Sequence, residues 1–115
     1  MEPRDGGNFW RKKGGLLIQQ PLIKLLPQWN NAAGSGIFAD NFFMDYFPDS
    51  LRKDASALFN KAGKIVRINE LVAINNLRGS FIMEGEKTNI KVTFTLTPEN
   101  PPLIQEYHIS EVEKN

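Results

Sequence analysis

The chain has 115 residues, no cysteine, a formal net charge of +1 and a charged fraction of 23%. This length suits one domain, which buries roughly two-thirds of its unfolded surface, and the near-neutral charge gives no electrostatic basis for binding nucleic acid. The lack of cysteine excludes disulfides, thiolate catalysis and cysteine-ligated metals, and no apolar run approaches the roughly 18 residues of a membrane-spanning helix.

Residues 1–15 are predicted to be a flexible basic leader, and residues 16–112 a single folded domain. Within the leader, Arg11–Lys13 precedes a broken apolar stretch. Three interpretations stay open for this segment: a mobile leader, part of a signal peptide, or an anchor on a membrane surface. The compartment of the protein is left open as well.

Residues 16–29 are predicted to form a short helix. Its apolar residues cluster after Pro21, and a proline suits the first turn of a helix. Pro27 is expected to end this helix, and the glycine- and asparagine-rich residues 30–36 read as a connector.

A core helix is expected next. Ser35 is a suitable N-cap, and Phe38, Phe42 and Tyr46 recur at four-residue spacing. Pro48 is expected to stop this helix because proline disfavours helical geometry in the residue before it.

A second helix is expected to begin with Asp49 as its cap and to end at Gly63. Four apolar residues fall on one face of it, namely Leu51, Ala55, Leu58 and Ala62.

After residue 63 the apolar period changes from that of a helix to that of a strand. Four antiparallel strands are predicted over residues 64–74, 77–84, 90–97 and 103–109, with a bulge near Asn69. The expected fold class is therefore α+β, with two to three N-terminal helices packed on a curved four-stranded meander.

The third predicted strand has the clearest alternation. Its buried side is expected to hold Ile90, Val92, Phe94 and Leu96, whereas Lys91, Thr93 and Thr95 face water. The fourth strand is expected to point Leu103, Gln105, Tyr107 and Ile109 one way.

The sequence Ser50-Leu51-Arg52-Lys53 spells the S-x-x-K motif of penicillin-binding proteins and class A β-lactamases. The companion motifs S-D-N and K-T-G are missing, so a first-turn serine and a solvated lysine are the simpler interpretation. His108 is the only histidine, so the chain cannot assemble a histidine-based metal site or catalytic triad. No metal and no cofactor is expected.

Asp40 and Asp45 flank the aromatic segment, and a carboxylate held among phenylalanines can act as a base. Their five-residue spacing puts them on different faces of a helix, so at least one is expected to lie in solvent.

Aromatic residues are numerous enough to line a cavity between the helices and the sheet, although plain core packing is expected for most of them. The candidates for pocket lining are Phe38, Phe42, Phe43, Phe47, Phe59, Phe81, Phe94 and Tyr107.

The strings FADNFFMDYFPDSLRKDASALFNKAGKI and LRGSFIMEGEKTNIKVTFTLTPENPPLIQ carry a resemblance to known proteins. Two helices followed by a four-stranded meander resemble the cystatin-like cone of the nuclear transport factor 2 and ketosteroid isomerase superfamily, over about residues 35–110. The strings are also similar to small accessory domains that precede β-lactamase-like serine hydrolases. A ketosteroid isomerase-like site needs a tyrosine and a protonated carboxyl, and its residues do not map onto this chain, where Tyr46 and Tyr107 are the only tyrosines.

The resemblance implies a non-catalytic accessory module for binding or dimerisation. The face of Lys91, Thr93 and Thr95 would then contact a second copy or a neighbouring domain of a longer chain. The alternative is a protein or isomerase-like enzyme that binds an apolar small molecule in the phenylalanine-lined pocket, with Asp40 or Asp45 as its base.

Overall fold

The computed structural model describes residues 15–26, 28–30, 32–75, 77–98 and 102–114. The expected leader, with Arg11–Lys13, lies outside the described residues apart from Gly15. The elements in chain order are α2 (Gly15–Leu25), the 3-10 helix η1 (Ala32–Gly34), α3 (Phe42–Asp45), α4 (Pro48–Ala62), β1 (Ile65–Ile68), β2 (Val72–Ala73), β3 (Arg78–Gly85), β4 (Asn89–Leu96) and β5 (Ile104–Val112). None of the helices in this part of the chain is long and apolar enough to cross a membrane.

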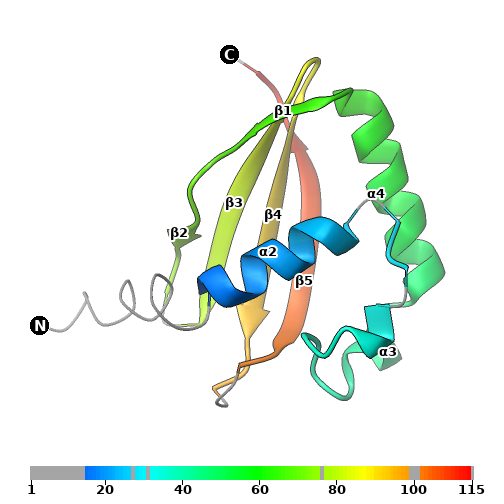
Figure 1. The fold of residues 1–115 in the computed structure, drawn as a ribbon, viewed down its shortest axis with the longest axis vertical. Coiled ribbons are helices and arrows are strands. Elements are labelled where there is room, and N and C mark those ends of the chain that lie inside the picture. Colours follow the sequence, from blue (N-terminus) through cyan, green and yellow to red (C-terminus); the bar gives the residue numbers. More distant parts are fainter. Residues whose placement is uncertain (1–14, 27, 31, 76, 99–101, 115) are drawn as a thin grey trace, which may run out of the picture.

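All the strand pairs of the sheet are antiparallel, in the order β1–β3–β4–β5, with β2 also paired to β3. Figure 1 shows the strands side by side, with α2 crossing in front of them and α4 beside the sheet, which confirms the α+β class. The predicted count of four strands is wrong, because the first is divided into β1 and β2 by residues 69–71. The Asn69 N–H still donates to the Ile82 carbonyl at 2.8 Å, so the edge stays attached to β3 across the break.

Burial alternates along β4 as predicted, with every second residue from Ile90 to Leu96 buried. The prediction for β5 is wrong at its start. Leu96 pairs with Ile104 and Thr95 with Glu106, so the pairing has an irregularity that leaves Gln105 as an extra residue. Ile104 is therefore the buried residue, and the alternation that brings Tyr107 into the core begins after the irregularity.

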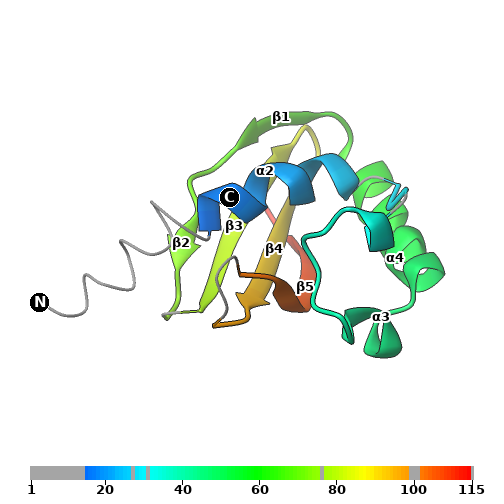
Figure 2. The ribbon, with the colours of Figure 1, turned by 60° about the horizontal axis from the view of Figure 1, so that its bottom comes forward.

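Helix α2 lies across one face of the sheet, which we call the inner face (Figures 1 and 2). It buries Ile18 and Leu22 in the same core as the sheet residues, and Leu26, which follows the helix, is buried there too. The helix begins at Gly15, one residue before the predicted range, and Pro21 lies inside it rather than in its first turn. A proline inside a helix costs one backbone hydrogen bond, and the burial of the apolar stripe offsets that cost.

The core helix expected around Phe38 is wrong over its first half. Phe38 forms a parallel bridge with Ile104, the Ala39 N–H donates to the Ile104 carbonyl at 2.8 Å, and the Ile104 N–H donates to the Ile37 carbonyl at 2.7 Å. Only Phe42–Asp45 is helical. The extended segment is favoured because it satisfies backbone groups along the edge of β5.

Helix α4 begins at Pro48, which we expected to end the preceding helix. Phe47 is its N-cap residue rather than Asp49, and proline is well tolerated in the first helical turn because its missing N–H would be unpaired there. The helix ends at Gly63 as predicted, with φ at 78° and the Gly63 N–H bonded to the Phe59 carbonyl.

An ion pair joins the end of α4 to β5. Lys61 Nζ lies 2.7 Å from Glu111 Oε1, and Thr88 Oγ1 donates to Glu111 Oε2 at 2.9 Å. The hydrogen bond from Lys61, followed by that from Thr88, lowers the pKa of Glu111 below its ordinary value of 4.5. The same pairing raises the pKa of Lys61.

Because the folded state lowers the pKa of Glu111, this carboxylate stabilises the fold above pH 4.5 and loses its contribution as the pH falls through the lowered value. Glu111→Gln is therefore expected to lower the melting temperature at neutral pH, with the difference from wild type closing in acid. Thermal unfolding between about pH 3 and pH 7 measures this. The exposed Asp40→Asn variant is the control, and a difference that does not change with pH would contradict the assignment.

Candidate functional site

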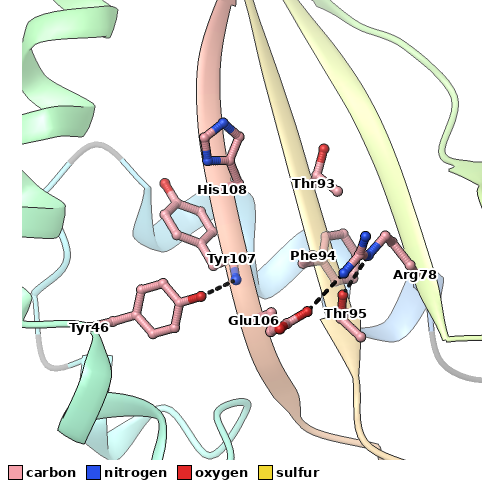
Figure 3. A pocket seen from close by; sticks show the side chains of 8 residues that line it. All are labelled: Tyr46, Arg78, Thr93, Phe94, Thr95, Glu106, Tyr107 and His108. Atoms are coloured by element: carbon pink, nitrogen blue, oxygen red, sulfur yellow. Dashed lines mark hydrogen bonds and ion pairs between the residues drawn. The ribbon is translucent and has the colours of Figure 1, made fainter.

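A cavity of about 350 Å³ opens on the face of the sheet opposite α2, which we call the outer face (Figure 3). Its lining residues are Tyr46, Arg78, Thr93, Phe94, Thr95, Glu106, Tyr107 and His108. The polar members come from three neighbouring strands, so the shape of the cavity depends on strand register.

Cross-strand pairing brings these polar residues together. Arg78 in β3 lies opposite Thr95 in β4, and Thr95 lies opposite Glu106 in β5. Thr93 and His108 form the next pair on the same face. Residues two apart on a strand share a face, so two adjacent cross-strand rows make one polar patch.

The charged part of the patch is a hydrogen-bonded group of three. Arg78 Nη2 lies 2.9 Å from Glu106 Oε1, and Arg78 Nε donates to Thr95 Oγ1 at 2.9 Å. The two charged side chains are 45% and 54% exposed. An exposed pair of this kind contributes about 0–1 kcal/mol, so an incoming polar group can replace either partner at little cost to stability.

Tyr46 forms the wall of the cavity beside β5. Its ring stacks on Phe42 with centroids 4.4 Å apart and an interplanar angle of 11°. Its hydroxyl oxygen accepts a hydrogen bond from the Tyr107 N–H at 3.4 Å. Figure 3 shows the side chain reaching from outside the sheet to the β5 backbone. Tyr46 therefore covers a backbone group on this edge of the sheet and bounds the site.

Behind the sheet, Tyr107 belongs to an aromatic cluster. Its ring meets Trp29 edge to face at 5.2 Å, and Trp29 also contacts Phe38 at 5.6 Å. The Tyr107 hydroxyl and Trp29 Nε1 are both buried without a hydrogen-bond partner among the described residues. Burial, with a smaller effect from the charge of Asp54, raises the pKa of Tyr107 well above its ordinary value of 10.0.

The residues expected to line an interior pocket occupy three places. Phe38, Phe42 and Phe43 pack together beside Tyr46. Phe81 and Phe94 form a separate pair on the inner face of the sheet, with centroids 6.3 Å apart. Phe59 is partly buried against the core, whereas Phe47 is 60% exposed. Phe94 and Tyr107 also line the outer cavity, which the sequence did not predict.

Of the expected contact residues, Thr93 and Thr95 line the cavity, and Lys91 lies farther along the same face, opposite Ser110. Sequence reasoning missed Arg78 and Glu106 as site residues. The alternation of side chains along β3 and β5 does predict that Arg78 and Glu106 lie on the face of the sheet away from the core. Their proximity depends on the cross-strand register that aligns β3, β4 and β5, which no local pattern shows.

The remaining candidates lie elsewhere. Asp40 and Asp45 are both exposed, and Ser50 and Lys53 are exposed on α4. Within the described ranges, no group of three His, Asp or Glu side chains could hold a metal ion.

No protein-family model matches the chain, and neither the curated proteins nor the solved structures contain a match to it. The chemistry of the site is therefore argued from its own residues.

The same substitution, tyrosine to phenylalanine, can be made at a hydroxyl with no described hydrogen-bond partner and at one that accepts a hydrogen bond. Tyr107→Phe removes a buried hydroxyl that has no described partner, so we expect the free energy of unfolding to stay level or rise by up to about 1 kcal/mol. Tyr46→Phe removes the acceptor of the Tyr107 N–H, so we expect a fall of about 0.5–1 kcal/mol. Urea unfolding at neutral pH measures both.

Alkaline pH provides a second check. The folded pKa of Tyr107 is raised, so its contribution to stability is present below pH 10.0 and is lost as the pH rises beyond it. Tyr107→Phe should reduce the loss of stability above that pH. If Tyr107→Phe markedly lowers the free energy of unfolding at neutral pH, the Tyr107 hydroxyl has a hydrogen-bond partner and the assignment is wrong.

Proposed function

We propose that the chain is a non-catalytic association module that binds a second copy of itself through the outer face of its sheet. Its architecture of helices on one face of an antiparallel sheet is compatible with the cystatin-like and nuclear transport factor 2-like domains that its sequence resembles. The observation that carries the proposal is the unequal covering of the sheet: α2 covers the inner face, whereas none of the described helices covers the polar, hollowed outer face (Figure 2).

The charges of the outer face favour pairing with itself. Arg78 and Lys91 lie on the same face as Glu84 and Glu106, so cations and anions are balanced. A two-fold contact places the same patch on both partners, which requires a surface that complements itself. A face of mixed sign meets this requirement, whereas a face of one sign would repel its copy.

The hydroxyls of Thr93 and Thr95 support the same function. They lie between the charged residues, in the middle strand of the patch. Threonine side chains on neighbouring strands tolerate both water and close contact with another sheet. The cavity beside them gives the partner a recess in which a side chain can be buried.

The contacts of the patch also favour binding over catalysis. An activated hydroxyl needs a base within hydrogen-bond reach. Thr93 and His108 are cross-strand neighbours, but in the described part of the chain no hydrogen bond joins their side chains. Thr95 Oγ1 accepts from Arg78, a donor that cannot take a proton from it.

Thr93→Arg tests this function. It places a bulky charge at the centre of the patch, so we expect a twofold fall in molar mass, measured by light scattering during size-exclusion chromatography. Asn60→Arg on the exposed side of α4 makes a similar change of charge away from the patch and should leave the mass unchanged. An equal mass for wild type and Thr93→Arg would contradict the proposal.

A small polar molecule is the second candidate for the outer cavity. Arg78 and Glu106 present opposite charges side by side in the cavity that Tyr46 also lines, which suits a zwitterion such as a free amino acid. Titration with a panel of amino acids should then shift the backbone amide resonances of Thr93 and His108. Arg78→Met should abolish these shifts, and the absence of shifts with the wild-type protein would remove this candidate.

A further inference from the structure

The inner face of the sheet is covered unevenly. Ile68 in β1 lies opposite Met83, so its side chain is on the inner face. Ala73 in β2 lies in one cross-strand row with Gly79 and Phe94, so it is on the inner face too. Ile68 is nevertheless 41% exposed, and Ala73 is exposed as well. The inner-face apolar residues of β3 and β4 are all buried, and they are Phe81, Met83, Ile90, Val92, Phe94 and Leu96.

The cover therefore stops before β1 and β2, and we call Ile68 and Ala73 the uncovered strip. Leu71, in the break between the two strands, is half-buried against the core. An amphipathic sheet normally buries the whole of its apolar face. The strip is the part of this face that the described helices leave open to solvent.

The chain enters α2 on the side of the sheet where the strip lies. In both ribbon views the beginning of α2 lies toward β2, at the end of the helix away from α4 (Figures 1 and 2). Fourteen residues precede Gly15 in the sequence. Five extended residues span up to about 17 Å, which is more than three times the spacing of neighbouring strands. A side chain at position 10 can therefore reach either of these edge strands.

The composition of this preceding segment complements the strip. Phe9 and Trp10 are its two aromatic residues, and aromatic side chains bury large apolar areas. Three basic residues follow them at positions 11–13. Glu70, in the break between β1 and β2, is exposed and forms no ion pair with another residue of the described ranges. Apolar and charged groups thus occur in both partners with matching character.

We propose that residues 9–13 dock on the uncovered strip of the same chain, with Trp10 against Ile68 and Ala73 and the basic residues beside Glu70. The segment completes the cover of the inner face that α2 begins. An exposed ion pair contributes little, so burial of the aromatic side chains stabilises the contact. This contact lies on the face opposite the cavity, so it is separate from the association proposed above.

Substitution of Trp10 in the full chain tests the contact without changing any residue of the described fold. Trp10→Ala should shift the backbone amide resonances of Ile68, Leu71 and Ala73, because the indole ring no longer lies beside them. Arg4→Ala changes the same preceding segment outside residues 9–13 and should leave these resonances in place. Unchanged resonances at all three positions in Trp10→Ala would overturn the docking.

The reciprocal change is made on the sheet. Ile68→Asp places a charge in the strip and should shift the indole N–H resonance of Trp10, which Trp10→Ala identifies among the two tryptophan signals. Val72→Asp is the matched control, because Val72 is 59% exposed on the same edge but lies opposite Ser80, on the outer face. An equal shift from Val72→Asp would contradict docking on the inner face. If Ile68→Asp does not unfold cooperatively, the comparison of Trp10→Ala with Arg4→Ala decides alone.

A mixture of two chains separates docking within one chain from exchange between copies. Isotope-labelled Trp10→Ala protein is mixed with an excess of unlabelled wild type. Docking within the chain leaves the labelled resonances of Ile68, Leu71 and Ala73 at their positions in the variant. Their return to the wild-type positions would show that the segment of a second copy fills the strip, and would overturn the proposal. None of these outcomes depends on the mass measured for Thr93→Arg, so this proposal and the outer-face function fail separately.

Discussion

The packing of Trp29 against Tyr107 and Phe38 is the contact on which the arrangement of the chain depends. Trp29 is 1% exposed and adopts a left-handed φ of 56°, and its N–H donates at 2.7 Å to the carbonyl of Leu25, the last residue of α2. Its ring joins the end of this helix to β5 and to the extended segment that pairs with Ile104. One buried side chain therefore links the helix that covers the inner face to the segment that covers the β5 edge. The outer face of the sheet is left without a covering helix among the described residues.

The buried aromatic packing and the exposed polar contacts are consequently located on opposite sides of the sheet. The aromatic cluster buries large ring surfaces, and this burial offsets the cost of leaving Trp29 Nε1 and the Tyr107 hydroxyl without described partners. The polar contacts of the outer face are solvent-exposed and individually weak, as in the pair of Arg78 with Glu106. Residues of that face can therefore exchange partners without unfolding the domain.

The sequence predicted what depends on local pattern. The alternation of β4 and the glycine at the end of α4 were read correctly because each follows from neighbouring residues. The four-residue spacing of Phe38 and Phe42 was misread as a helix, since it reflects packing in a cluster that includes an extended segment. The site was missed for a related reason. Arg78 and Glu106 are 28 residues apart in the chain and meet only through the strand register that sets both opposite Thr95.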